Sequence, residues 1–144
     1  MSYLVKADPG VSEDLEALAG EQAGVPADWR LKPGEIDATI DLAVRLIKSL
    51  RDNPYQGELM QGRANTRVLE GCRRLKFDPE EPWPRGPEGH PRPRLRLVWI
   101  NEPDEGSIAL VRVLALTHRF DSRPYRRSAS RLGAVRRAAR GERR

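Results

Sequence analysis

Apolar residues recur at helical spacing between residues 35 and 51, and this pattern predicts an amphipathic helix over Glu35–Arg51. Polar residues such as Asp37, Asp41 and Arg45 fall between them and would face solvent. The dipeptide Asn53-Pro54 is expected to end this helix, because a residue that precedes proline avoids helical backbone angles. The apolar stripe consists of Ile36, Ile40, Ala43, Val44, Ile47 and Leu50.

The N-terminal part of the chain predicts a short strand and a first helix. Residues Tyr3 to Ala7 form the strand candidate, and Pro9-Gly10 interrupts it. Ser12 can serve as a helix N-cap, so the first helix is expected to start there. Glycines and prolines in residues 20–34 predict a loop between the two helices.

Alternation of apolar and charged side chains predicts strands in the second half of the chain. Leu75 and Phe77 point one way while Arg74 and Lys76 point the other. Residues 94–100 repeat this alternation, and residues 107–117 are almost continuously apolar. A strand of that kind is covered on both faces, so we expect residues 107–117 in the middle of the sheet.

Three consecutive strands without an intervening helix imply an antiparallel meander. We therefore predict an α+β fold with an N-terminal strand, two helices, a three-stranded antiparallel meander and a short C-terminal helix around residues 124–132. Residues 1–135 form a single domain in this prediction. Six prolines make residues 79–93 an extended, mobile insertion, and residues 136–144 are expected to be a basic, disordered tail.

Composition and charge limit the size of the fold and the class of partner that is expected. The chain has 144 residues, of which 38% are hydrophobic and 33% charged, enough for one small core. The formal net charge is +5, and the basic side chains gather at the end of the chain, because residues 119–144 carry ten basic and two acidic ones. An anionic partner is expected, and nucleic acid is the first candidate.

Cysteine and histidine usage excludes several classes of site. The single cysteine, Cys72, cannot form an internal disulfide, and His90 and His118 are too far apart in sequence to suggest a metal cluster. We therefore expect no cofactor and no metal. The sequence has no leader pattern and no apolar run long enough for a membrane span, so a cytoplasmic protein without membrane contact is expected.

Short runs lie along the second half of the chain at a fixed spacing, among them Leu69 to Phe77, Arg96 to Trp99 and Leu114 to Arg119 followed by Tyr125. Through these runs and the order of its elements, the sequence resembles the RelE/ParE superfamily of bacterial type II toxins. The RelE-like branch is a group of ribosome-dependent mRNA endonucleases. Membership would imply an antitoxin as a protein partner and mRNA on the ribosome as the substrate.

The resemblance also implies an active site. In the RelE-like branch this site uses basic side chains on two adjacent strands, an arginine at the end of the last strand and a tyrosine six residues later. Carried over by position, these are Lys76, Arg96, Arg119 and Tyr125 as catalytic residues, with Arg74 where the family commonly has lysine. Further RNA-binding candidates are Arg73, Arg94 and His118.

The chemistry of RNA cleavage agrees with this set. Cleavage without a metal requires the 2′-hydroxyl to lose a proton, the charged phosphorane to be stabilised and the leaving oxygen to gain a proton. Arg96 and Arg119 would hold the phosphate, Lys76 or Arg74 would stabilise the anion, and Tyr125 would relay a proton or stack on a base. Arginine in place of lysine at Arg74 keeps the charge but is a poorer proton donor.

Other interpretations stay open at this point. Arg74, Lys76 and Arg96 could equally form a solvated face of the sheet, and Arg119 and Tyr125 could be a strand-end cation and a packing aromatic. The whole chain could be a ParE-like gyrase-binding toxin without catalysis, or a decayed member that only binds RNA. A partner protein is expected on the sheet edge or in the cleft, where it would displace the terminal helix.

Overall fold

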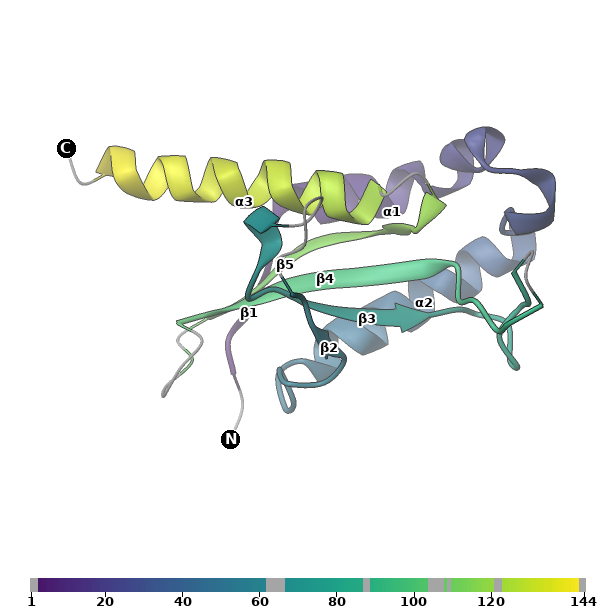
Figure 1. Cartoon of the computed structure of the whole chain (residues 1–144), viewed down its shortest axis with the longest axis horizontal. Coiled ribbons are helices and arrows are strands. Elements are labelled where there is room, and N and C mark those ends of the chain that lie inside the picture. Colours follow the sequence, from purple (N-terminus) through teal and green to yellow (C-terminus); the bar gives the residue numbers. More distant parts are fainter. Residues whose placement is uncertain are drawn as a thin grey trace.

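The computed structural model contains a five-stranded mixed sheet with helices packed on both faces (Figure 1). It describes residues 3–61, 67–86, 89–103, 108, 110–120 and 123–142. The α+β class is therefore confirmed. The elements are β1 (Val5–Ala7), α1 (Pro9–Glu21), η1 (Gln22–Gly24), η2 (Ala27–Trp29), α2 (Pro33–Ser49), β2 (Glu58–Leu59), η3 (Arg67–Leu69), β3 (Arg73–Phe77), β4 (Leu95–Glu102), β5 (Leu110–His118) and α3 (Arg123–Glu142).

The sheet has the strand order β1-β5-β4-β3-β2. The pairs β3-β4 and β4-β5 are antiparallel, which confirms the predicted meander, whereas β1 joins β5 in parallel. The prediction that residues 107–117 occupy the middle of the sheet is wrong by one strand, because β4 lies at the centre and β5 lies beside it. The two-residue strand β2 was not predicted, since two residues carry no recognisable alternation.

Two apolar clusters lie on opposite faces of the sheet. On one face, Leu97 and Trp99 of β4 pack with residues of α1 and α2, including Leu18 and Ala43. On the other face, Val98 of β4 packs with Leu114 of β5 and Leu132 of α3. Figure 1 shows α3 and α2 on opposite sides of the strands. The alternation along β4 therefore sends neighbouring side chains into two different cores.

The helix starts follow local capping chemistry. The first helix begins at Pro9 rather than after Ser12, because the Asp8 carboxylate accepts a hydrogen bond of 2.9 Å from the Gly10 amide and so caps the helix. The second helix begins at Pro33, two residues before the predicted start, and the Glu35 carboxylate accepts a hydrogen bond of 2.9 Å from the Lys32 amide.

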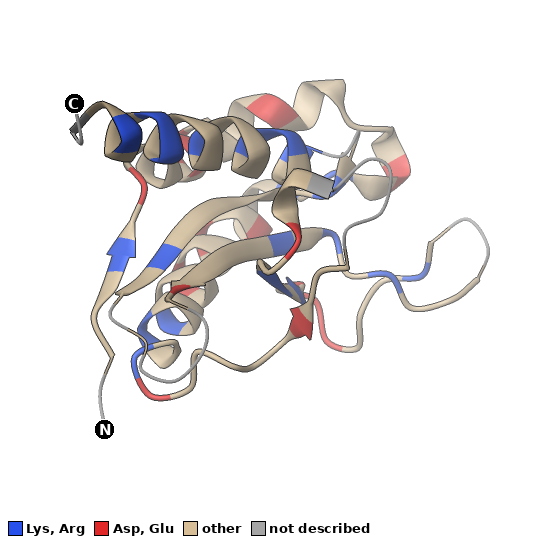
Figure 2. Cartoon of the chain, turned by 60° about the vertical axis from the view of Figure 1, so that its left-hand side comes forward, with Lys and Arg blue, Asp and Glu red and all other residues tan. Residues whose placement is uncertain are grey.

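Helix α3 is longer than the sequence pattern predicts. It continues through Glu142, so the prediction of a disordered tail from residue 136 is wrong for residues 136–142, and residues 143 and 144 lie outside the described residues. Figure 2 shows Lys and Arg gathered along this helix.

Within the described ranges, no helix combines the length and the apolar content that a bilayer crossing requires.

The proline-rich segment 79–93 is folded back on itself. Arg85 and Pro91 form an isolated antiparallel bridge, and the Arg92 amide donates a hydrogen bond of 2.7 Å to the Pro84 carbonyl. The Gly86 amide likewise donates to the His90 carbonyl at 2.9 Å. The expectation of an extended connection is therefore wrong for the described part of this segment, whose two arms are hydrogen-bonded to each other.

Candidate functional site

A pocket opens on the α3 face of the sheet, where β3, β4, the end of β5 and the start of α3 meet. Its volume is about 360 Å³, which is large enough for a small ligand. The four side chains predicted to be catalytic all line it, together with Arg74. The lining residues are Arg74, Lys76, Pro91, Arg92, Pro93, Arg96, Arg119 and Tyr125.

The register of the sheet brings the strand cations together. Lys76 of β3 lies directly opposite Arg96 of β4 in the antiparallel pair. Arg74 lies two residues before Lys76 and therefore shares its face. Leu75 and Phe77 face the opposite core, as the alternation predicts. Arg74, Lys76 and Arg96 thus form one side of the pocket.

Arg96 is the most deeply buried cation of the pocket. Only 5% of this residue is exposed, and its Nη1 donates hydrogen bonds of 2.7 and 2.8 Å to the carbonyls of Pro93 and Leu95. Its Nε atom is buried without a hydrogen-bond partner, and burial lowers the pKa of Arg96 to about 10. Among the described residues no carboxylate pairs with Arg96. The site therefore holds a desolvated positive charge that an incoming anion would stabilise.

Tyr125 reaches the pocket from the first turn of α3. Its hydroxyl accepts a hydrogen bond of 3.0 Å from Nη1 of Arg74, and the Arg74 guanidinium lies 5.9 Å from the centre of its ring. A phenol held beside a cation in this way can exchange a proton with a bound ligand.

Glu58 lies beside the pocket and adds a negative charge next to two of its lining cations, and sequence reasoning missed it. Its carboxylate contacts Nη2 of Arg74 at 3.2 Å and Nζ of Lys76 at 3.4 Å. The hydrogen bond from Arg74 and the charge of Lys76 lower the pKa of Glu58, so this carboxyl is ionised at neutral pH. The preceding Gly57 has a φ of +74° and passes close to the Arg74 carbonyl, which only glycine allows without strain.

Arg119 lies directly after β5, as predicted, and its amide donates a hydrogen bond of 2.7 Å to the Arg94 carbonyl. Burial lowers the pKa of Arg119, and the nearby charge of Arg92 lowers it further. Arg92 comes from the proline-rich segment, where no sequence pattern marks it as functional, so sequence reasoning missed it as well.

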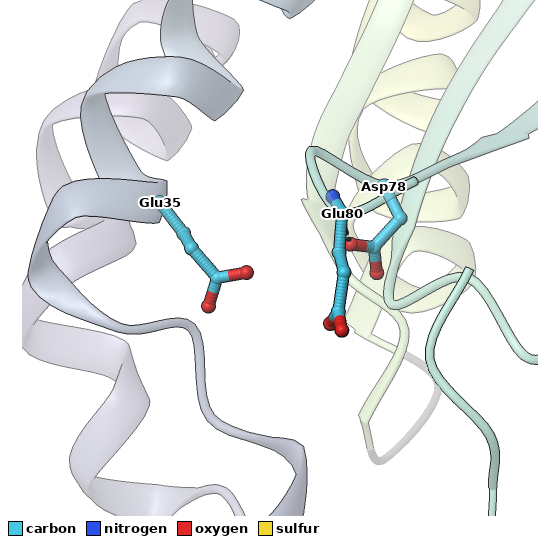
Figure 3. A group of neighbouring side chains, drawn as sticks. All are labelled: Glu35, Asp78 and Glu80. Carbon is cyan, nitrogen blue, oxygen red and sulfur yellow. Dashed lines mark hydrogen bonds between the residues drawn. The ribbon is translucent and has the colours of Figure 1, made fainter. Parts of the chain in front are cut away.

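Arg94 lies away from the pocket, and the expectation that it shares a face with Arg96 is wrong. Its guanidinium is buried, and Nη2 contacts the carboxylates of Asp78 at 2.8 Å, Glu35 at 2.9 Å and Glu80 at 3.6 Å. Figure 3 shows these three acidic side chains converging from α2 and from the segment after β3. Their oxygens lie within 4.8 Å of one another, a spacing that suits a metal ion, but the Arg94 guanidinium already supplies the cation.

The other two RNA-binding candidates also lie outside the pocket lining. Arg73 donates hydrogen bonds to the carbonyls of Gln56 at 3.1 Å and Tyr55 at 2.6 Å, on the opposite side of β3 from Arg74. His118 is fully buried, and this burial lowers its pKa to about 4. Both side chains therefore support the fold around the pocket. Cys72 is also fully buried, and burial raises the pKa of its thiol to about 11.

A set of ion pairs fastens α3, and with it Tyr125, to α1. The buried Asp14 accepts hydrogen bonds from Arg127 at 2.9 Å and from Arg131 at 2.6 Å, and also from the Leu116 amide at 3.0 Å. Arg127 pairs with Glu21 as well. Because Arg127 follows Tyr125 by two residues, these contacts fix the helix turn that carries the phenol.

Two solved structures are similar to this chain. One is the toxin-antitoxin complex RelBE2 from Mycobacterium tuberculosis, with 18% identity over 83% of this chain and 100% of that chain and a TM-score of 0.44. The other is a mutant of the E. coli toxin RelE in the free state, with 14% identity over 92% of this chain and 99% of that chain and a TM-score of 0.49. No protein-family model matches the chain, and no curated protein matches it in sequence.

Proposed function

We propose that this protein is a RelE-like toxin that cleaves mRNA on the ribosome without a metal ion and acts in the cytoplasm. The observation that carries the proposal is the convergence of five cationic side chains and one phenol on a single pocket. Among the described residues, Glu58 is the carboxylate that pairs with cations of this pocket, and it pairs with Arg74 and Lys76. A surplus of positive charge around a small cavity favours a phosphate ligand, and the phenol adds a group able to transfer a proton.

The substrate phosphate would bind to Arg96 and Arg119. Both guanidiniums are partly or wholly desolvated, and neither pairs with a carboxylate among the residues that the structure describes. A bound phosphate would restore the missing counter-charge. The same contacts would strengthen as the phosphorane gains a second negative charge, which is the condition for catalysis rather than binding alone.

Proton transfer would involve Glu58 and Tyr125. Glu58 is ionised and held by Arg74 and Lys76, so it can accept the proton of the ribose 2′-hydroxyl. Tyr125 would donate its phenolic proton to the leaving 5′-oxygen, and its contact with Arg74 would stabilise the phenolate that results. In this arrangement Arg74 and Lys76 carry charge only, which suits an arginine at position 74.

Primer extension on mRNA from cells induced for the protein tests the proposal. We expect cuts within translated codons, together with arrested growth. Arg119→Ala or Tyr125→Phe should each reduce cleavage about a hundredfold and relieve the arrest, because each removes a group that contacts the transition state. Arg112→Gln is the matched control, since Arg112 pairs with Glu102 on the same sheet and does not line the pocket.

Intact transcripts in arrested cells would contradict the nuclease proposal, and broken DNA in the same cells would favour gyrase poisoning. An antitoxin is proposed as the protein partner. We expect its helix or extended segment on the sheet edge or in the cleft, where it would displace α3. A crystal structure of the complex with α3 still in place would contradict that expectation.

A further inference from the structure

Trp29, in the turn η2 between α1 and α2, lies beneath two cations of the pocket. The guanidinium carbon of Arg119 lies 4.6 Å from the centre of the indole ring, and that of Arg92 lies 5.5 Å from it. Cations over an indole face are attracted to the electron-rich ring, most strongly when water is excluded. One aromatic side chain thus holds two arginines that come from distant parts of the sequence.

The backbone of Trp29 is fixed to β5, the strand that ends one residue before Arg119. His118 Nδ1 accepts a hydrogen bond of 3.0 Å from the Phe120 amide, so the neutral ring carries its proton on Nε2. Nε2 then donates to the Trp29 carbonyl at 2.8 Å. His118 is the last residue of β5 and directly precedes Arg119. The hydrogen bond from His118 to the Trp29 carbonyl therefore holds the residue that carries the indole next to the residue that carries the guanidinium.

Arg92 is held in place from its other side. Its amide is bonded to the Pro84 carbonyl, and its side chain runs across Gly86. A β-carbon at Gly86 would meet Cγ of Arg92 at 3.0 Å and Cδ at a still shorter distance, so any larger residue there would push the arginine away. Because Gly86 has no side chain, the Arg92 side chain has room to extend across it into the pocket.

The two sides of the pocket differ in charge balance. On the strand side, Glu58 partly neutralises Arg74 and Lys76. Near Trp29, neither Arg92 nor Arg119 pairs with a carboxylate of the described residues, and each repels the other. Two like charges held close together on a rigid support create a strong preference for an anion between them.

We propose that Trp29, Arg92 and Arg119 form a second phosphate subsite, which takes the phosphodiester next to the one bound at Arg96 and Arg119. Arg119 would lie between the two phosphates and contact both. Trp29 is a positioning residue in this subsite, and the two arginines contact the ligand. The inference rests on the proposed function in that the ligand is a polynucleotide. It adds that the pocket recognises at least two consecutive phosphates of one strand.

Binding of short DNA ligands, which lack the 2′-hydroxyl and resist cleavage, tests the subsite by calorimetry. The probes are a mononucleotide 5′-phosphate, with one phosphate, and a 5′-phosphorylated dinucleotide, with two. We expect the full chain to bind the dinucleotide at least tenfold more tightly. Arg92→Gln should remove most of this preference while leaving the mononucleotide affinity within about twofold. Trp29→Leu should also remove most of the preference, and because Arg119 loses its aromatic support, the mononucleotide affinity should fall as well, by a smaller factor.

Two further variants keep the test sharp. Trp29→Phe retains an aromatic face and should retain most of the preference, whereas Arg96→Met should weaken both ligands. The Arg92→Gln variant should also lower the slope of log affinity against log salt concentration by about 0.7 for a longer single strand, the value for one lost phosphate contact. Thermal unfolding by circular dichroism checks that each variant is folded.

Equal affinity of the unaltered protein for the two ligands would overturn the subsite, and so would a folded Trp29→Leu variant that keeps the preference. Cleavage is measured separately, on RNA. If the dinucleotide preference follows Trp29 while mRNA stays intact, the subsite stands and the nuclease proposal fails. If the Trp29→Leu variant cuts mRNA normally and keeps the preference for the dinucleotide, the nuclease proposal stands and the subsite fails.

Discussion

Arg94 and Arg96 stand two residues apart and are almost equally buried, with 4% and 5% of each residue exposed, yet their surroundings are opposite. Arg94 contacts the carboxylates of Asp78 and Glu35, and although burial works against it, these hydrogen bonds raise its pKa. Arg96 interacts with backbone carbonyls and with the Tyr125 phenol, and burial lowers its pKa to about 10. One guanidinium is neutralised within the fold, whereas the other has no carboxylate partner in the part of the chain that the structure describes.

The difference separates a structural role from a functional one. A buried ion pair with several hydrogen bonds costs little once formed, but removing one partner exposes the full desolvation cost of the other. A buried cation without a carboxylate is unfavourable for the fold, so its presence points to a ligand that supplies the missing charge. Stability measurements and activity measurements should therefore respond to these two arginines in opposite ways.

The largest effect is expected from Arg94→Ala. This change leaves the Asp78 carboxylate buried without its cation, so the free energy of unfolding should fall by about 3–5 kcal/mol in urea denaturation. Arg96→Met is the matched control and should leave the stability unchanged or slightly raised. If both changes lowered the free energy of unfolding equally, the distinction between a structural Arg94 and a functional Arg96 would be wrong.

The next effect concerns activity. Arg96→Met should reduce RNA cleavage by about a hundredfold, equivalent to roughly 2.7 kcal/mol of transition-state stabilisation, because the phosphate loses a desolvated donor. The measurement is the single-turnover rate on ribosome-bound mRNA with the variant at saturating concentration. A folded variant with normal cleavage would show that the unpaired charge has no part in the reaction.

A smaller effect is expected from His118, which lies between the two regions. Burial holds its pKa near 4 in the folded protein, whereas the unfolded chain takes up the proton near pH 6.5. The unfolded state therefore binds more protons in this window, and the free energy of unfolding should fall by about 2 kcal/mol from pH 7 to pH 5. A His118→Gln variant should lack this part of the pH dependence in otherwise identical urea titrations.

The smallest effect is stabilisation by inorganic phosphate. At a few times its dissociation constant the ion should raise the free energy of unfolding by about 1 kcal/mol, because it binds the folded pocket alone. Chloride at the same ionic strength is the control for general screening. Arg96→Met should lose the response and Arg112→Gln should keep it, and a response shared by both variants would place the ion elsewhere.

The sequence predicted the elements in which the apolar pattern repeats over many residues. The predicted helix Glu35–Arg51 matches α2 within two residues at each end, and the alternation around Arg74 and Arg96 correctly predicted adjacent strands. Lys76, Arg96, Arg119 and Tyr125 line one pocket because strand register and the strand end fix their positions. Their catalytic role stays a prediction.

The sequence could not predict what depends on contacts between distant segments. Arg94 looks like Arg96 in any local pattern, and only the approach of α2 and the segment after β3 supplies Glu35 and Asp78. Glu58 lies in a strand of two residues, and Arg92 lies among prolines, so neither has a periodic signal. The long α3 was missed because charged residues and glycines mask its apolar stripe.

The ion pairs between α1 and α3 have a consequence for how the protein is made. Helix α3 follows every strand in chain order, so the ribosome produces the sheet and its cations before it produces Tyr125, Arg127 and Arg131. Until those residues emerge, Asp14 lacks its arginine partners and the cavity lacks its phenol. A chain that ends before Tyr125 therefore has the cations of the strands but neither the phenol nor the arginines that attach α3 to α1.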